Sequence, residues 1–204
     1  MPNIDTNALL ANVEQARRGE AYEAMEAIAR EICDEVLNDL SIDQMRVLSR
    51  LDYELHMAAY QQSLTDPANA QVLLHQSQRL AARSMGEALF AGDEVGALIA
   101  QENVYGLIYP ALGKWREGVV GCEQSRERLE EIATNVSTSD VDESRAFRFA
   151  ANAHCHCMRM VVAHKGSKSS VAFWLTEIAK NPVYIAKPND FRTDVQAAQR
   201  YIQE

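Results

Sequence analysis

The stretch that decides the fold is Asn103–Gly118, which reads NVYGLIYPALGKWREG. Apolar residues recur before Gly113 at the three- and four-residue spacing of a helix, and a second segment with the same spacing begins at Trp115. Glycine accepts the left-handed backbone conformation that commonly ends a helix. The stretch therefore predicts two helices joined by a tight turn at Gly113, as a helical hairpin over residues 93–133.

Similar turns recur along the chain. Breaks between paired helices fall at Gly19, Thr65, Gly113 and Gly166, which are 46, 48 and 53 residues apart. One amphipathic hairpin cannot bury its apolar face alone, so a regular two-helix unit favours a stack of hairpins. We expect a single all-α domain over residues 1–204. Its hairpins are predicted at about 5–40, 42–92, 93–133 and 141–181, with a C-terminal capping helix at 190–203.

Local signals mark where several helices begin. Ser41 precedes a helical segment and Gln44 follows three residues later, which is the pattern of a capping box. Asp66 followed by Pro67 predicts a helix whose first residue is the proline. Asp93 is expected to cap the helix that leads into the turn at residue 113.

The residues around Gly113 resemble a tetratricopeptide repeat. In that family a small residue, here Gly106, lets the two helices of a hairpin approach closely, and Tyr109 and Trp115 match aromatic packing positions. Gly118 stands where the family usually has alanine. The resemblance implies a right-handed α-α superhelix of about four hairpins plus the capping helix. Leucine at position 106 is then expected to be disruptive and alanine to be tolerated. An unrelated helical bundle with a similar turn is the alternative.

The resemblance also implies where a partner binds. In the family the first helix of each hairpin lines a concave groove that holds a peptide. The expected function is therefore protein–protein interaction, by a scaffold, an adaptor or a chaperone-like binder of a peptide or helical segment. A regulatory or sensor domain that binds a small ligand or a signal peptide is the alternative. The positions implied for the groove are Leu55, Gln62, Asn103, Leu107, Pro110, Ala111, His156, Met160 and His164.

Charge and composition narrow the possible partners and the location. The formal net charge of −9 disfavours binding of nucleic acid or an anionic membrane, because both need clustered basic side chains. Residues 1–145 carry a net charge of −13 and residues 146–204 a net charge of +4, so a homo-oligomer that joins the acidic body to the basic C-terminal end is a further possibility. The sequence shows no signal-peptide pattern, no long apolar run and only four cysteines, which together predict a cytoplasmic protein.

Motifs that carry chemistry are sparse. The sequence contains no P-loop, no dinucleotide-binding glycine pattern and no zinc-protease pattern, so we expect neither catalysis nor a cofactor. The segment His154–His164 concentrates histidine, cysteine and methionine, which are soft or borderline metal ligands. Neighbours on one helix point in different directions, so four of them cannot surround a metal ion. We therefore expect Cys155 and Met158 to pack in the core and no metal to bind.

Overall fold

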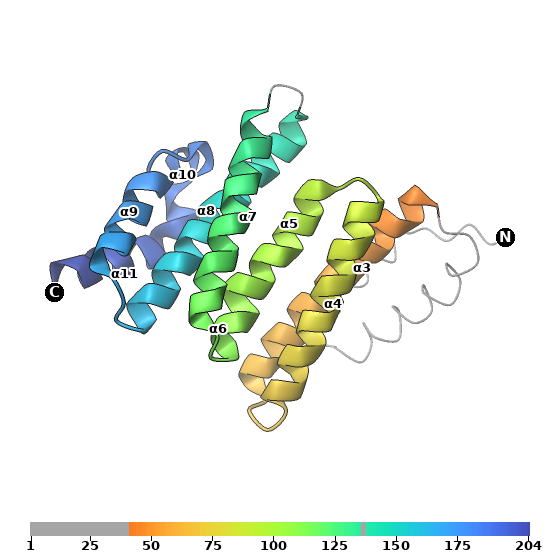
Figure 1. The fold of residues 1–204 in the computed structure, drawn as a ribbon, viewed down its shortest axis with the longest axis horizontal. Helices are drawn as coiled ribbons and strands as arrows, with labels where there is room; N and C mark the ends of the chain where they lie inside the picture. Colours follow the sequence, from red (N-terminus) through yellow and green to blue (C-terminus); the bar gives the residue numbers. More distant parts are fainter. Residues whose placement is uncertain (1–40, 136–137) are drawn as a thin grey trace. The chain divides into compact units, whose positions relative to one another are not determined.

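The computed structural model describes residues 41–135 and 138–204 (Figure 1). Within these ranges the secondary structure is helical and contains no strand, which confirms the all-α class. The hairpin predicted at about 5–40 lies outside the described residues. The chain divides after Ala100 into two compact units.

The first unit pairs α3 (Ile42–Thr65) with α4 (Ala70–Phe90) as an antiparallel hairpin (Figure 1). The predicted capping box at the start of α3 is confirmed. The N–H of Gln44 donates to Oγ of Ser41, and the N–H of Ser41 donates to Oε1 of Gln44. These two bonds satisfy backbone donors that the first turn of a helix otherwise leaves without an acceptor.

The start of α4 differs from the prediction. Pro67 was expected as the first helical residue, but α4 begins at Ala70. The carboxylate of Asp66 accepts bonds from the backbone N–H and the side-chain amide of Asn69, at 3.3 and 2.8 Å, and these bonds close a turn ahead of the helix. The predicted cap at Asp93 is confirmed, because its Oδ1 accepts the backbone N–H three residues later at 2.7 Å.

Polar side chains join α3 to α4 at two levels. Oγ of Ser49 donates to the carbonyl of Ser84 at 2.9 Å, and Oγ of Ser84 donates to the carbonyl of Ser49 at 2.8 Å. One heptad further along α3, Nδ1 of His56 lies 2.8 Å from Oγ of Ser77, which donates to the carbonyl of His56 at 2.9 Å. Burial lowers the pKa of His56 to about 4. These paired bonds fix the register of the hairpin, because a shift along either helix breaks both levels.

Three consecutive segments lead to the turn that the sequence predicts at residue 113. They are α5 (Glu94–Asn103), the π-helical segment η1 (Val104–Ile108) and the short helix α6 (Tyr109–Ala111). Pro110 lacks an N–H and its ring crowds the carbonyl four residues earlier, so the ordinary helical bond cannot form there. The N–H that follows η1 instead bonds a carbonyl five residues back. Gly113 has a φ of 77°, which confirms it as the turn glycine.

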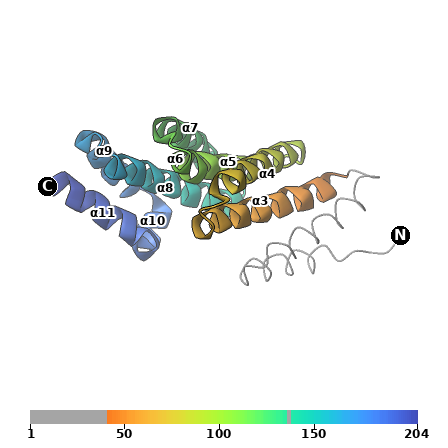
Figure 2. The same ribbon diagram turned by 90° about the horizontal axis from the view of Figure 1, so that it is seen from below.

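Helix α8 is the centre of the second unit, and α7, α9, α10 and α11 all contact it (Figure 2). The predicted hairpin at 141–181 corresponds to α8 and α9, and the predicted capping helix to η2 and α11. Cys155 and Met158 are buried in the core of this unit, as predicted. The elements are α7 (Trp115–Thr134), α8 (Asp140–Ala163), α9 (Lys168–Ile178), α10 (Pro182–Ala186), η2 (Pro188–Phe191) and α11 (Arg192–Gln203).

Close contacts in the second unit depend on three glycines. A Cβ atom on Gly118 would lie 2.6 Å from the carbonyl oxygen of Tyr105, and one on Gly121 would overlap the Tyr105 ring. These two glycines of α7 therefore allow the close approach within the hairpin. A Cβ atom on Gly106 would instead overlap the imidazole of His156 on α8. The expectation that alanine is tolerated at position 106 is wrong for this structure.

Candidate functional site

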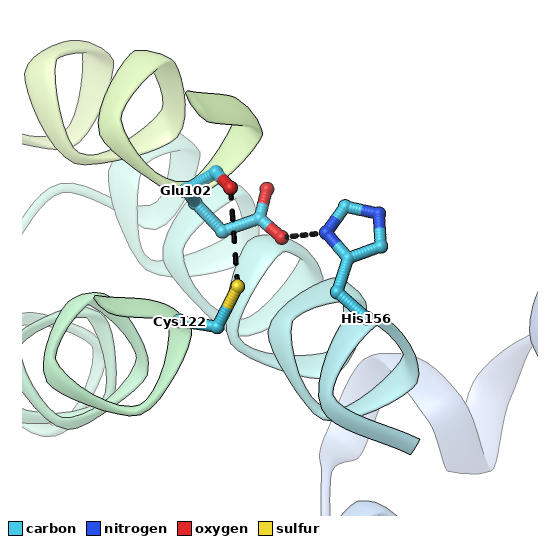
Figure 3. A group of neighbouring side chains, drawn as sticks. All are labelled: Glu102, Cys122 and His156. Atoms are coloured by element: carbon cyan, nitrogen blue, oxygen red, sulfur yellow. Dashed lines mark hydrogen bonds and ion pairs between the residues drawn. The ribbon is translucent and has the colours of Figure 1, made fainter. Parts of the chain in front are cut away.

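Three potential metal ligands from three helices meet inside the second unit (Figure 3). Glu102 lies near the end of α5, Cys122 in α7 and His156 in α8. A carboxylate oxygen, the thiol sulfur and an imidazole nitrogen all lie within 4.8 Å of one another. The exposed fractions of the three residues are 0%, 0% and 8%. This metal-ligand cluster is therefore almost closed to solvent.

The contacts inside the metal-ligand cluster are few. Nδ1 of His156 lies 2.5 Å from Oε1 of Glu102, yet the two atoms do not meet in hydrogen-bond geometry. Neither carboxylate oxygen of Glu102 has a hydrogen-bond partner among the described residues. The thiol of Cys122 donates a long bond of 4.0 Å to the backbone carbonyl of Glu102 and also interacts with Cys157, outside the cluster. A fully buried carboxylate thus has one imidazole as its close polar neighbour, although burial of a carboxylate is costly unless it is well paired.

The local backbone explains how the imidazole reaches the carboxylate. Glu102 and Gly106 are four residues apart and therefore lie on one face of the helical segment. Because Gly106 has no side chain, the ring of His156 occupies the space beside it. The change from α5 to the π-helical η1 takes place between the two positions, and π-helical segments frequently occur at functional sites.

The buried thiols near the cluster are not activated nucleophiles. A hydrogen bond with Cys157, together with burial, holds the pKa of Cys122 far above its ordinary value. Burial raises the pKa of Cys155 to about 12. Nucleophilic cysteines need the opposite shift, which a positive neighbour or a helix N-terminus provides. Without a metal ion, these two thiols stay protonated at neutral pH.

A second polar network in the same unit joins charged side chains on α7 to side chains on α8 and α9. Nε1 of Trp174 donates to Glu123 at 2.7 Å, and Arg126 bonds both Glu123, at 3.1 Å, and Glu130, at 2.5 Å. Nε2 of His154 lies 3.6 Å from Oε1 of Glu130. Burial acts to raise the pKa of Glu130, but the nearby imidazole of His154 and the charge of Arg126 lower it overall. This network joins α7 to α8 and α9 and is structural.

A carboxyl pair in the first unit responds to pH near neutrality. Asp52 on α3 and Glu87 on α4 share Arg83, whose nitrogens lie 3.0 Å from Asp52 and 3.9 Å from Glu87. Burial raises the pKa of Asp52 to about 6. Burial and the charge of Asp52 raise the pKa of Glu87 to about 7. The positive charge of Arg83 acts to lower both pKa values, but its guanidinium is half exposed and solvent screening weakens this effect.

The positions implied for a groove do not form one exposed surface. Four of the nine are buried, three are half-buried and two are exposed. A buried side chain packs within the protein and cannot contact a partner in this structure. The exposed His164 stacks on Trp115 with ring centroids 4.8 Å apart. The buried positions are Leu55, Asn103, His156 and Met160. The half-buried positions are Gln62, Leu107 and Pro110, and the exposed positions are Ala111 and His164.

An open pocket of about 400 Å³, the tyrosine pocket, lies on the surface of the second unit. The rings of Tyr105 and Tyr109 meet edge to face with centroids 5.0 Å apart and form an apolar wall. Val120 completes this wall and is 58% exposed. Sequence reasoning missed the pocket because most of its lining residues belong to α7, whereas the resemblance places a groove on the first helix of each hairpin. The lining residues are Tyr105, Tyr109, Arg116, Glu117, Val120, Gly121 and Gln124.

Comparisons with known proteins show no relationship. No family model, no curated protein and no solved structure matches the chain. None of the helices within residues 41–135 and 138–204 has the length and apolar character needed to cross a membrane.

Proposed function

We propose that the chain is a protein-interaction module that holds a segment of another protein in the tyrosine pocket. The single observation that carries the proposal is the pocket itself, an apolar wall of two tyrosines and a valine with charged side chains at its rim. Tyrosine and arginine are over-represented among residues that dominate binding energy at protein interfaces. The pocket volume lies at the lower end of the range for ligand sites, which suits one side chain of a partner.

The occupant that fits best is a protein segment that inserts one apolar side chain. Tyr105, Tyr109 and Val120 contact that side chain, while Arg116 and Glu117 pair with polar groups on either side of it. Small-molecule sites usually bury most of their ligand. An open pocket suits a segment that continues past the site, and this favours protein binding over the sensor-domain alternative.

The proposal extends to the architecture and location expected from the sequence. The α3–α4 pair and the turn at Gly113 are consistent with a tetratricopeptide-like stack of hairpins in a right-handed superhelix. The raised thiol pKa values of Cys122 and Cys155 suit a protein that performs no thiol chemistry. Reduced cysteines suit a cytoplasmic location.

Val120→Glu is expected to reduce partner binding at least tenfold, because a carboxylate placed against the tyrosine rings loses its hydration without gaining a partner. Helicity and melting temperature are expected to stay within error of the wild type, since Val120 is largely exposed. The measurement is quantitative mass spectrometry of proteins retained from native cell extract by immobilised wild type and variant. The bound protein is then titrated against both by calorimetry.

Val141→Glu is the matched control, because Val141 is 68% exposed and lies outside the pocket. It should retain the same proteins as the wild type. If Val120→Glu binds the partner with wild-type affinity, or if Val141→Glu loses it equally, the partner does not use the tyrosine pocket.

A further inference from the structure

We propose that Glu102, Cys122 and His156 bind one divalent transition-metal ion inside the second unit, and that the metal is zinc. A carboxylate oxygen, a thiolate sulfur and an imidazole nitrogen are the three ligand types that zinc accepts in proteins. A mixed set with one sulfur and one nitrogen disfavours magnesium and calcium, which prefer oxygen ligands. Three protein ligands leave one of the four tetrahedral positions to a small molecule such as water.

The distances in the metal-ligand cluster suit a tetrahedral site. Zinc–ligand bonds of about 2.0–2.3 Å place neighbouring ligand atoms roughly 3.3–3.8 Å apart. In the structure, Glu102 and His156 approach to 2.5 Å, and no ligand-atom separation exceeds 4.8 Å. The first distance is shorter than the required value, and 4.8 Å is the upper limit for the other two. Rotation of the Glu102 and Cys122 side chains can bring their ligand atoms to the required spacing while the His156 ring and the three helices keep their places.

The contact between Glu102 and His156 points to a third, shared partner. The two atoms are close, but they do not meet in hydrogen-bond geometry, and both oxygens of the carboxylate lack a hydrogen-bond donor among the described residues. Two ligands of one metal ion lie farther apart than this, so an ion bound between them would separate the two atoms. A divalent cation in that position compensates the buried carboxylate, which an imidazole at one oxygen does only in part.

A second histidine of α8 shows that a buried histidine beside a glutamate does not by itself make a metal site. His154 lies next to Glu130 and is 1% exposed, but Arg126 also bonds Glu130 and compensates its charge. No cysteine joins His154 in a metal-ligand cluster among the described residues. Glu102, the glutamate beside His156, has no hydrogen-bond donor among the described residues, and Cys122 joins His156 in the metal-ligand cluster. Ligands from the His154–His164 helix alone cannot surround a metal ion, whereas this site takes only His156 from that helix.

The test measures metal binding directly in the reduced, untagged, full-length protein after removal of metal ions. Zinc affinity is obtained by competition with a chromophoric chelator, and Co²⁺ is added separately as a spectroscopic probe. We expect one equivalent of either metal per chain. Co²⁺ should show strong visible bands typical of a tetrahedral site and a near-ultraviolet charge-transfer band from the thiolate. Cys122→Ser should abolish the charge-transfer band, and Glu102→Gln and His156→Asn should each weaken zinc binding at least tenfold.

His154→Asn and Cys155→Ser are the matched controls, because they change the same residue types at buried positions of the same helix. Both should keep wild-type zinc affinity. The melting temperature of the wild type should also rise with added zinc, and this readout does not depend on any variant folding. Absence of stoichiometric zinc and Co²⁺ binding by the folded wild type would overturn the proposal, as would equal losses in the control variants. The result is independent of the tyrosine pocket, whose test uses partner binding.

Discussion

Gly106→Ala is expected to destabilise the protein by about 3 kcal/mol, even though alanine in a helix usually adds about 1 kcal/mol. The new Cβ atom would occupy the position of the His156 ring. The ring cannot move aside cheaply, because it is buried and lies against the carboxylate of Glu102. Its displacement leaves a buried carboxylate without its close polar neighbour. Chemical denaturation followed by circular dichroism measures the change.

Gly86→Ala is the control for this experiment. Gly86 is an exposed position in α4, and no described atom lies within 4 Å of the Cβ that alanine adds. It is expected to stabilise the protein by about 0.5–1 kcal/mol through helix propensity. If Gly106→Ala is as stable as the wild type, the His156 ring does not lie against Gly106. The geometry of the metal-ligand cluster would then also be wrong.

Glu87→Gln is expected to stabilise the protein by about 2 kcal/mol at pH 8 and to change its stability little at pH 5. The pKa values of Asp52 and Glu87 are raised from 3.8 and 4.5 to about 6 and about 7. The folded state therefore binds these protons more tightly than the unfolded state does. The free energy of unfolding consequently falls as pH rises from about 4 to about 7, and the loss is complete above that window. Glutamine at position 87 removes one of the two buried charges that cause this loss of stability.

The measurement is the free energy of unfolding of wild type and variant at pH 5 and at pH 8. The lowered pKa of His56 acts in the opposite direction, since it reduces stability as pH falls from 6.5 to about 4. Comparison of two variants at one pH cancels this contribution. Glu131→Gln, at a largely exposed position in α7, should have little effect at either pH. Equal effects of Glu87→Gln at both pH values would show that the carboxyl pair does not titrate in this range.

The sequence predicts best those features that depend on neighbouring residues. The capping box at Ser41 and Gln44, the cap at Asp93 and the turn at Gly113 all follow from backbone bonding within a few residues, and all are confirmed. The start of α4 was misplaced because two local patterns compete at Asp66. Its carboxylate can cap a helix at Pro67 or close a turn, and in the structure it closes the turn.

Contacts between segments that are far apart in the sequence could largely not be predicted from it. Gly106 was assigned to the wrong neighbour, because periodicity shows which face of a helix is small without showing what packs there. Glu102 and Cys122 belong to no motif, and only the packing of three helices brings them to His156. One signal was present. Glu102 is a charged residue at the helical spacing of the buried Val95 and Ile99, and a charge on an apolar stripe indicates a buried polar site.

The central position of α8 has a consequence for how the second unit opens. Because α7, α9, α10 and α11 all pack on this helix, none of them can detach without exposing part of it. Local openings at the end of the chain, where Arg159 on α8 holds Asp194 on α11 at 2.7 Å, leave the middle of α8 covered by α7. Backbone amide hydrogens in the middle of α8 therefore exchange with solvent only when the whole unit unfolds. Hydrogen exchange followed by mass spectrometry should therefore show the amides of α11 exchanging before those in the middle of α8.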